Sequence, residues 1–490
     1  LSGYVTINLV KYLLPIISLI AVFFLLSFRL LDTPPGLTID EAAFGYNATL
    51  LSRTLHDQNG RLLPVFVLSI DGQDWRQPVT QYYQAAFFRL FGASVLNLRL
   101  SSVVVTLFAL ILLYYLTHKL LGTLAAVAAA TIFITTPIVF FQAHLGLDNN
   151  VPMVFTLLWL ISLHRYHRQQ KPLNLFAAGI ALGLSFYSYK AMRAILPVWS
   201  FLTLADIFIS SAPFLRRLKH SLYFILGLAP FLLVIPWLET HYAGAVFDKH
   251  GASFGDIYSF LFPYLSSFDL SFLFLQGDAT LYHSTQRHGM FLLASLPLFV
   301  IGLYQAVKKD RFWLLIVISL FTAPILYGMV NSVHRASRLM AFVPQFCLVA
   351  SLSLESLRHS RFQLPLVIFV ACLYLLNFTD FVGYFWYQYP VVSQTGKAYG
   401  QLSQYQSFAA LASQSQKTQL TPYINRTVYL DEGESAHFFE AIYFTTPLQQ
   451  WDSDDQPTPP GTILLSTRDN IPGMDPLQLP LPRYHLHINP

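Results

Sequence analysis

Long apolar runs recur along most of this chain, and they limit what it can fold into. A helix that crosses the hydrocarbon core of a bilayer needs about 20 predominantly apolar residues. Only 11% of the 490 residues are charged and 54% are hydrophobic, whereas a soluble domain carries roughly 25% charged residues. So few charges do not cover the surfaces of several soluble domains, and so much apolar sequence excludes a disordered chain. We therefore expect a polytopic α-helical membrane protein.

Eleven apolar stretches are candidates for membrane-spanning helices. Lys11 precedes the first stretch and no small-residue cleavage site follows it, so we expect a retained anchor helix and not a removed signal peptide. Cys347 and Cys372 lie inside apolar stretches, where a free thiol is a small hydrophobic group, and this excludes a disulfide framework. The eleven stretches are Leu13–Leu31, Leu98–Thr117, Leu121–Phe141, Val151–Leu163, Leu173–Tyr187, Ala194–Ser210, Leu222–Leu238, Met290–Ala306, Phe312–Met329, Leu339–Leu354 and Leu364–Tyr384.

The distribution of Lys and Arg predicts the orientation, because cytoplasmic loops carry an excess of these residues. One set of alternating connections is short and basic: His118-Lys119, His164–Lys171, Arg216–Lys219, Lys308–Arg311 and Arg358–Arg361. The other set is longer and mixed in charge: Asp32–Asn97, Phe141–Asn150, Glu239–Gly289 and Asn331–Arg338. We expect a multi-pass protein of the plasma (inner) membrane with a cytoplasmic N-terminus and an extracytoplasmic C-terminus. The net charge of +5 does not indicate a nucleic-acid partner, since the basic residues lie in these short clusters.

The composition changes near residue 390 and predicts a second domain. Alternating apolar stretches lie at Arg426–Leu430, Ala441–Phe444 and Gly461–Leu465, and a polar helical stretch lies near Leu402–Ser413. This mixture favours a small α/β fold. We predict a transmembrane domain over residues 1–389, whose first outer loop (32–97) carries catalytic acids, and a small extracytoplasmic α/β domain over 390–490.

Two of the outer loops each present an acid at the membrane surface. Asp40 and Glu41 are adjacent in the first outer loop, and Asp148 precedes the helical stretch that starts near Val151. Each site has a structural alternative, because acids complement the N-terminal end of a helix dipole. Asp40 or Asp148 would then be a helix N-cap, with Pro152 in the first turn after Asp148. Two acids from separate outer loops favour a shared site over two independent caps.

Cations gather on the same side, against the positive-inside bias. The structural alternative is that they extend toward the head groups or pair with nearby acids. Four clusters from separated loops instead favour an anion site, and Arg suits phosphate because its planar fork binds in a bidentate manner. The candidate substrate-binding residues are Arg76, Tyr187, Tyr189, Lys190, Arg193, Arg287, His288, His334, Arg335 and Arg338.

Acids and phosphate-binding cations at the outer surface fit the chemistry of a sugar held on a lipid phosphate. A carboxylate removes the proton from an acceptor hydroxyl, and the hydroxyl oxygen attacks the anomeric carbon. Arg and Lys stabilise the charge that develops on the departing phosphate. A single displacement inverts the anomeric configuration, and it needs no general acid because the phosphate is already a good leaving group.

The architecture and loops resemble the GT-C glycosyltransferases, in particular bacterial members similar to protein O-mannosyltransferases and aminoarabinose transferases. The segment Ile39–Gly45 resembles the Asp-Glu motif of the mannosyltransferase first loop, which implies Asp40 as catalytic base with Glu41 as its companion. Trp75–Val79 resembles the Lys-Pro-Pro stretch and implies a phosphate contact for Arg76. Leu147–Pro152 resembles the second acidic motif, which implicates Asp148. The stretches Tyr187–Arg193 and Arg287-His288 are similar to stretches in bacterial relatives.

The resemblance covers roughly residues 10–385 and implies a polyprenyl-phosphate-linked sugar as donor; it does not imply a divalent metal. The chain departs from the family in two places. The loop Glu239–Gly289 is too short for the large β-trefoil insertion of the eukaryotic members, and Arg76-Gln77 replaces the usual Lys-Pro. Both departures leave the acceptor open among a protein, a glycolipid and a cell-wall glycan.

Two alternatives remain beside this reading. A transporter or flippase of lipid-linked sugars needs ionisable residues near mid-membrane, and the predicted spans are nearly free of them. An oligosaccharyl transferase or O-antigen ligase uses a pyrophosphate-linked glycan. The former resembles this architecture but carries a divalent metal and a larger soluble domain with a Trp-Trp-Asp run, so chelator sensitivity separates the two enzymes. No His/Cys spacing in the loops indicates a metal site.

Overall fold

The computed structural model describes residues 2–70, 72–247, 256–330, 332–355, 363–395, 399, 403–453, 456–479, 481 and 484–490. The predicted basic loop Arg358–Arg361 and Asn331 lie outside these residues. The chain divides into two compact units. Unit 1 comprises Leu1–Leu30 and Ser102–Gln388, and unit 2 comprises Leu31–Ser101 and Tyr389–Pro490.

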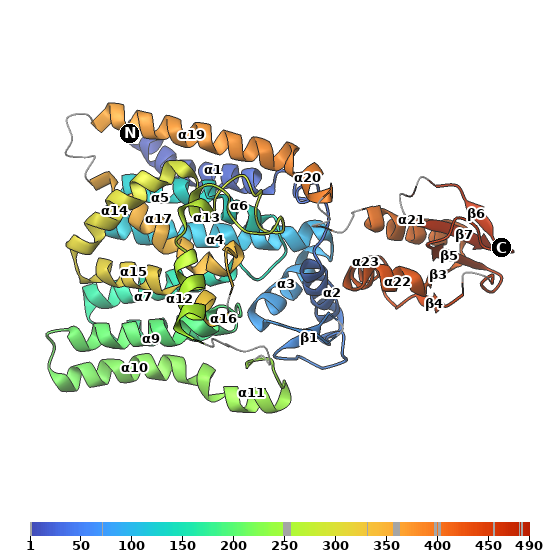
Figure 1. Cartoon of the computed structure of the whole chain (residues 1–490), viewed down its shortest axis with the longest axis horizontal. Helices are drawn as coiled ribbons and strands as arrows, with labels where there is room; N and C mark the ends of the chain where they lie inside the picture. Colours follow the sequence, from blue (N-terminus) through green and yellow to red (C-terminus); the bar gives the residue numbers. More distant parts are fainter. Residues whose placement is uncertain are drawn as a thin grey trace. The chain divides into compact units, whose positions relative to one another are not determined.

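Unit 1 is helical throughout (Figure 1), as the long apolar runs predict. Each of the eleven predicted stretches is helical over most of its length. The helices are α1 (Ser2–Ser27), α4 (Val95–Leu121), α5 (Thr123–Thr135), α6 (Pro137–Ala143), α7 (Val151–Gln169), α8 (Pro172–Phe186), α9 (Met192–Ile209), α10 (Phe214–Leu233), α11 (Ile235–His241), α12 (Ile257–Ser266), α13 (Leu270–Phe274), α14 (Leu296–Lys309), α15 (Arg311–Thr322), α16 (Ile325–Val330), α17 (Val343–Leu352) and α19 (Gln363–Tyr387), with 3₁₀ turns η1 (Leu293–Ser295) and η2 (Ala336–Phe342).

Within the described residues, six helical segments are long and apolar enough to cross a membrane, or seven if the bent pair α5 and α6 counts as one span. Three further apolar helices are shorter: Pro15–Ser27, Pro172–Phe186 and Ala336–Leu352. Large apolar side chains such as Leu226 and Leu233 of α10 and Leu376 of α19 are exposed, as expected for a surface that faces lipid. The predicted fold class of a multi-pass helical membrane protein is thus confirmed, while the count of eleven spans stays a prediction.

One apolar segment was not expected as a helix. The segment Ile257–Phe274 passes the same length and hydropathy criteria, yet it lies inside the predicted outer loop Glu239–Gly289. It is one of the six candidates counted above, and it is divided into α12 and α13 after Ser266. In Figure 1, α12 runs across the direction shared by α9 and α10. This geometry favours a lateral helix over a twelfth span.

Small residues let the long helices of unit 1 approach closely. A Cβ atom at Gly179 of α8 would lie 2.3 Å from the Phe224 carbonyl oxygen of α10, and one at Gly227 would lie 2.2 Å from the Phe176 carbonyl oxygen. A Cβ atom at Gly302 of α14 would meet the Val349 carbonyl oxygen of α17. Close backbone contact of this kind replaces the hydrophobic driving force that helices lack inside a bilayer.

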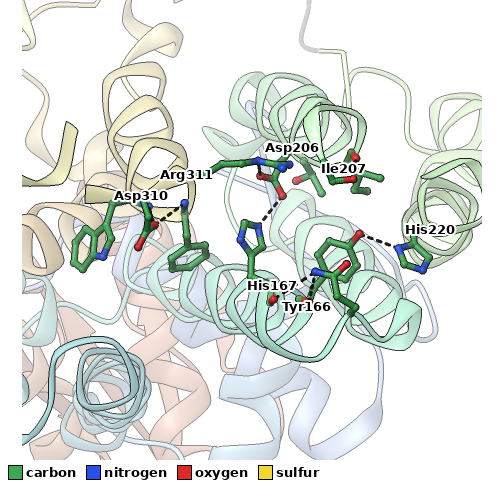
Figure 2. A network of polar contacts seen from close by, with 12 residues as sticks. Tyr166, His167, Asp206, Ile207, His220, Asp310 and Arg311 are labelled. Atoms are coloured by element: carbon green, nitrogen blue, oxygen red, sulfur yellow. Dashed lines mark hydrogen bonds and ion pairs between the residues drawn. The ribbon is translucent and has the colours of Figure 1, made fainter. Parts of the chain in front are cut away.

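A polar network ties α7, α9, α10 and α15 together at one end of unit 1 (Figure 2). The buried Asp206 carboxylate accepts a hydrogen bond from His167 Nε2 at 2.8 Å and pairs with Arg311 Nε at 2.7 Å. The hydroxyl of Tyr166 lies 2.8 Å from His220 Nδ1. The α9–α10 and α14–α15 connections lie at one shared end (Figure 1), and the basic residues of Arg216–Lys219 and Lys308–Arg311 lie in the helix ends beside them. The network therefore lies where the charge bias predicts the cytoplasmic side.

Unit 2 contains helices and a mixed five-stranded sheet. The strands are ordered β4-β3-β5-β7-β6, with β3 parallel to β4 and β5, and β7 antiparallel to β5 and β6. Its elements are α2 (Ile39–Thr54), β1 (Val67–Ser69), β2 (Asp74–Arg76), α3 (Pro78–Phe91), α20 (Tyr389–Thr395), α21 (Ser403–Thr418), β3 (Thr421–Asn425), α22 (Arg426–Glu432), α23 (Glu434–Tyr443), β4 (Gln449–Trp451), β5 (Thr462–Ser466), β6 (Asp475–Leu477) and β7 (His485–Asn489).

The predicted small α/β fold of the tail is confirmed, although two local assignments change. Gly461–Leu465 corresponds to β5, but the alternating stretches Arg426–Leu430 and Ala441–Phe444 belong to helices α22 and α23. A cap explains the first change, because Asn425 Oδ1 accepts from the Thr427 amide at 2.8 Å and starts α22. Local capping thus outweighs the alternation of apolar residues.

The core of unit 2 joins the first outer loop to the tail. Gly45 of α2 lies against the ring of Phe438 in α23, so that a Cβ atom there would lie 2.4 Å from Phe438 Cζ. The Phe438 ring also stacks on Phe88 of α3, with 6.4 Å between ring centroids. Residues from both segments share one buried cluster. These contacts group the first outer loop with the tail that starts at Tyr389. The sequence predicts this loop as part of the transmembrane domain over residues 1–389.

Candidate functional site

Helix α2 begins with a capping box that fixes the geometry of the acidic pair in unit 2. Thr38 is the N-cap: its Oγ1 accepts from the Glu41 amide at 3.0 Å, and the Glu41 carboxylate accepts from the Thr38 amide at 3.2 Å. Each partner satisfies a backbone donor that the helix start would otherwise leave open. The alternative in which Asp40 is the N-cap is therefore wrong.

Asp40 lies in the first turn of α2 with its side chain 50% exposed. Its Oδ1 accepts from Arg76 Nη1 at 2.8 Å, and its Oδ2 has no hydrogen-bond partner among the described residues. Arg76, at the end of β2, is almost fully buried: Nε donates to Ser69 Oγ at 2.8 Å and the guanidinium lies 5.0 Å from the Phe44 ring centroid. A rigid cation thus orients one oxygen of Asp40 and leaves the other accessible.

Glu41 has a different environment from its neighbour. It is fully buried, and Oε1 pairs with Arg99 Nε at 3.1 Å, with Arg99 buried as completely. Arg99 Nη1 also donates to the Pro34 carbonyl at 2.9 Å, and Nη2 donates to the Gly36 carbonyl. This pair ties the start of α2 to α4 and to the chain segment before α2. Burial of both members favours a positioning role for Glu41 over contact with a substrate.

In unit 1, Asp148 lies in the turn before α7, with its backbone carbonyl accepting from the Val151 amide at 3.3 Å. The N-cap of α7 is Asn150, so the alternative in which Asp148 is the N-cap is also wrong, while Pro152 does occupy the first turn. Beside Asp148, Asn149 Nδ2 donates to Gln142 Oε1 at 2.9 Å, and Gln142 Nε2 lies 2.9 Å from His283 Nδ1. These buried amides hold the acidic turn against α6 and against the loop that carries His283.

The stretch Tyr187–Arg193 connects α8 to α9. Tyr187 donates its hydroxyl proton to the Phe231 carbonyl at 2.6 Å. Tyr189 and Lys190 lie in the turn before α9, which begins at Met192, and both are partly buried. Arg193 Nη1 donates to the Val246 carbonyl at 2.9 Å. Two of the predicted substrate-binding side chains, Tyr187 and Arg193, therefore also hold backbone segments of unit 1.

Arg287 and His288 meet an acid of α19 that the sequence did not single out. His288 Nε2 lies 3.0 Å from Asp380 Oδ2, and His288 Nδ1 lies 2.9 Å from Thr285 Oγ1. The exposed Arg287 has Nη2 3.8 Å from Asp380 Oδ1. Burial lowers the pKa of His288 below its ordinary value, and the Asp380 carboxylate opposes this in part. His288 thus acts chiefly as an anchor between its loop and α19.

The third cationic stretch folds onto a buried aspartate. Asp278 Oδ2 accepts from the Ala336 amide at 2.6 Å, while Arg335 Nη1 lies 3.9 Å from Asp278 Oδ1. His334 stacks on Phe272 with 5.0 Å between ring centroids and lies 3.4 Å from Asp269. Arg338, partly buried, makes no ion pair or hydrogen bond through its side chain with any residue that the structure describes.

The structure therefore connects loops that the sequence kept apart. Residues 277–289 and 334–338 share Asp278 and the hydrogen bond from the Ala279 amide to the His334 carbonyl at 2.9 Å. Sequence reasoning missed Arg99, Asp278 and Asp380, although an Arg or Asp inside or beside an apolar stretch is a usable signal, because such charges require partners.

Among the described residues, no group of three or more His, Cys, Asp or Glu side chains is arranged to hold a metal ion. A small cavity of about 10 Å³ lies beside Asp278 and His288, lined also by Phe141 and Met290. That volume is close to what a single water molecule requires.

Comparison with known proteins gives one family match and several structural matches. Residues 76–239 match the family described as dolichyl-phosphate-mannose-protein mannosyltransferase. A search of curated protein sequences returned no match. The structure is similar to ArnT from Cupriavidus metallidurans in the apo state, with a TM-score of 0.59 and 12% identity over 97% of this chain and 98% of that chain. The chain has the GT-C fold.

The structure of the same ArnT bound to undecaprenyl phosphate matches this GT-C chain with the same TM-score, identity and coverage. An archaeal oligosaccharyltransferase, AglB from Archaeoglobus fulgidus, matches over 87% of this chain and 63% of that chain, with 13% identity and a TM-score of 0.46. The family match and the two ArnT matches confirm the predicted resemblance to mannosyltransferases and aminoarabinose transferases, and the prediction of a glycosyltransferase-type enzyme. The family match begins at Arg76 and includes Asp148 and Tyr187–Arg193, while Asp40 and Glu41 precede it.

Proposed function

We propose that this GT-C protein transfers a sugar from a polyprenyl-phosphate carrier to an acceptor hydroxyl at the outer face of the membrane. The single observation that carries the mechanism is the half-exposed Asp40 carboxylate, which the buried Arg76 holds through Oδ1 at 2.8 Å. The donor class is supported by the similarity to ArnT, whose structure binds undecaprenyl phosphate. The acceptor class stays open among a protein, a glycolipid and a glycan.

In the proposed reaction, Asp40 takes the proton of the acceptor hydroxyl through Oδ2. The acceptor oxygen forms a bond to the anomeric carbon while the bond between that carbon and the phosphate oxygen breaks. The electron pair leaves with the polyprenyl phosphate, and the anomeric configuration inverts. A general base of this kind contributes about 10²–10⁴-fold to the rate. Glu41 and Arg99 keep the first turn of α2 in place, and Asp148 of unit 1 is proposed as a further catalytic acid.

The cations of unit 1 are proposed to stabilise the departing phosphate. Arg338 is the strongest member of the set, since its side chain has no ion-pair or hydrogen-bond partner among the described residues and lies partly buried. Arg287 pairs only at 3.8 Å and Arg335 only at 3.9 Å, distances at which a phosphate competes well with the carboxylate. Tyr189, Lys190, Arg193, His288 and His334 are proposed to shape or line the same donor site.

We also propose that the protein lies in the plasma (inner) membrane with its N-terminus in the cytoplasm. Basic loops between helices support this orientation, because two of them lie at one shared end of unit 1 (Figure 1). Unit 2 would then lie on the extracytoplasmic side together with Asp40. This orientation is what a donor lipid with an outward-facing head group requires.

The test compares Asp40→Asn with Asp74→Asn in the purified full-length chain. Both carboxylates contact Arg76 Nη1, Asp40 at 2.8 Å and Asp74 at 3.3 Å. Each variant therefore removes the negative charge of one of the two carboxylates that contact this guanidinium. Turnover is measured as undecaprenyl phosphate released from undecaprenyl-phosphate-linked mannose and aminoarabinose, with a cell-envelope extract as the source of acceptors. We expect Asp40→Asn to lose about 10²–10⁴-fold while donor binding persists, and Asp74→Asn to stay near the parent rate.

Nuclear magnetic resonance of the product gives the anomeric configuration independently of any variant. Inversion is expected for a single displacement. Retention, or an Asp40→Asn rate close to that of the parent, would remove Asp40 from the mechanism. Equal losses in both aspartate variants would instead indicate that the carboxylates serve only to hold Arg76.

A further inference from the structure

An apolar groove of about 550 Å³ runs between α4, α7 and α8 in unit 1. Its walls include Leu112 of α4, Leu158 and Ile161 of α7, and Ala177, Ala181 and Leu184 of α8. Ala177 and Ala181 are four residues apart and share one face of α8, where their methyl groups leave space that larger side chains would fill. From Leu158 to Arg165 the groove follows α7 for about 10 Å. These dimensions suit a segment of extended hydrocarbon chain.

Arg165 and Tyr115 line one end of the groove, and Lys119, one turn further along α4, lies near the same aromatic ring. Arg165 Nη2 donates to the Tyr115 hydroxyl at 3.1 Å, and the Arg165 guanidinium carbon lies 5.6 Å from the Tyr115 ring centroid. Lys119 Nζ lies 5.8 Å from the centroid of the same ring. In the described part of the chain, neither cation pairs with a carboxylate. Two positive charges held at one ring repel each other, and an anion between them would relieve that repulsion.

Snorkelling is the simplest alternative, since Arg and Lys near a helix end extend toward the head groups. Snorkelling accounts for the exposure of each side chain. Snorkelling does not account for the position of both cations beside the Tyr115 ring. Nor does it account for the groove, lined in part by small residues, that leads to this ring. A basic pocket between membrane helices is instead typical of a site for an anionic lipid head group.

We propose that this groove binds an anionic phospholipid of the membrane. One acyl chain lies along Leu158, Ala177 and Ala181, and the phosphate lies between Arg165 and Lys119, within reach of the Tyr115 hydroxyl. Under the proposed orientation, this lipid comes from the cytoplasmic leaflet, because Lys119 and Arg165 belong to the basic loops. Arg bound to phosphate is among the stronger charge-assisted contacts in proteins.

The groove is distinct from the proposed donor site. Along α7, Arg165 lies about 21 Å from Val151, which follows the Asp148 turn. The basic end of α7 therefore cannot serve the same phosphate as Asp148 and its neighbours. The occupant is a membrane lipid that the protein does not consume, and loss of this site is separable from loss of transfer.

Native mass spectrometry of the full-length protein in detergent tests the inference. The probes are dioleoyl phosphatidylglycerol and dioleoyl phosphatidylcholine, which share acyl chains and differ in head-group charge. We expect one saturable phosphatidylglycerol site, with phosphatidylcholine at least about ten-fold weaker. The double change Arg165→Gln with Lys119→Gln should weaken phosphatidylglycerol by roughly 10–100-fold, as for the loss of one or two charge-assisted bonds, and Ala181→Trp should block the hollow itself.

Two matched controls lie outside the groove. Arg168→Gln removes another exposed cation of the same helix end, and Val127→Trp adds the same bulk to an exposed position of α5. Both should bind phosphatidylglycerol as the parent does. The inference is overturned if the two lipids bind equally, or if Arg168→Gln weakens binding as much as the double change. It is also overturned if undecaprenyl phosphate displaces phosphatidylglycerol at a ten-fold lower concentration, since the groove would then hold the sugar carrier.

Discussion

Replacing Arg99 with methionine removes the cation that faces the buried Glu41 carboxylate. Both side chains are fully buried and their charged atoms lie 3.1 Å apart. After the change, Glu41 keeps its hydrogen bond from the Thr38 amide at 3.2 Å, while the Pro34 and Gly36 carbonyls lose a donor. Breaking one side of a buried ion pair costs about 3–5 kcal/mol, because the remaining charge stays in a poorly solvating environment.

That free energy translates into a measurable shift in melting temperature. Unit 2 belongs to the size class of about 150–250 residues, in which 1 kcal/mol shifts Tm by about 2–4 °C. We therefore expect Arg99→Met to lower the transition of unit 2 by roughly 6–20 °C. The assay is thermal melting of the full-length protein in detergent, with hydrogen exchange of α2 and α3 peptides assigning the transition to unit 2. Arg89→Met, at an exposed position of α3, is the matched control and should stay within about 0.5 kcal/mol of the parent.

A double-mutant cycle separates the ion pair from the capping box. Glu41→Gln keeps a side chain that can complete the capping box but leaves Arg99 without its counter-charge. Combined with Arg99→Met, it removes both charges, so the pair of changes should cost less than the sum of the single changes by about 3 kcal/mol. Additive losses, or an Arg99→Met transition equal to that of Arg89→Met, would refute the reasoning. The turnover of the Glu41→Gln variant, measured below its melting temperature, then shows whether Glu41 acts only by positioning the first turn of α2.

Three further outcomes follow from the described contacts. Arg338→Ala should weaken binding of an undecaprenyl-phosphate-linked sugar by roughly 10–100-fold, and Arg338→Lys should recover it in part. Arg335→Ala should weaken it less, because the Arg335 side chain is more solvated; equal losses at both positions would contradict this ranking. Because burial lowers the pKa of His288 below its ordinary 6.5, the unfolded chain binds more protons, so Tm should fall as the pH drops through about 6.5, less in His288→Gln and more in Asp380→Asn. A phosphatase reporter fused after Pro490 should be active on the extracytoplasmic side, and cytoplasmic activity would reverse the proposed orientation.

The long helices could be predicted from the sequence because apolar length is a strong signal in a membrane protein. Short elements could not be predicted in the same way. Ile257–Phe274 lies inside the predicted loop Glu239–Gly289. Its apolar run is interrupted by Ser266, Ser267 and Asp269, and at that interruption α12 ends and α13 starts. The alternating pattern of Arg426–Leu430 indicated a strand, yet the Asn425 cap starts a helix there. In both places a hydrogen-bonded cap decides the outcome over the apolar pattern.

For the site, residue identity was easier to predict than residue role. The sequence indicated Asp40 and Glu41 together, but it carried no sign that one is half exposed while the other is buried. That difference comes from Arg99, 58 residues further along the chain, and from the Thr38 cap. Likewise the acids that face the predicted cations, Asp278 and Asp380, come from segments that periodicity alone does not bring near those cations. Partners distant in sequence are fixed by tertiary packing, which a single sequence does not display.

The composite core of unit 2 has a consequence for the order of biosynthesis. The Gly45 backbone of α2 packs against Phe438, and the residues that complete this core begin only at Tyr389. Roughly 290 residues separate the two segments of unit 2, and at about 5–20 residues per second their synthesis takes roughly 15–60 s. During that interval the first outer loop has been made while its packing partner has not. In a nascent chain the first outer loop, which carries Asp40, therefore lacks its packing partner until the helices of unit 1 have been made. The core that positions the proposed base forms only after synthesis has passed α19.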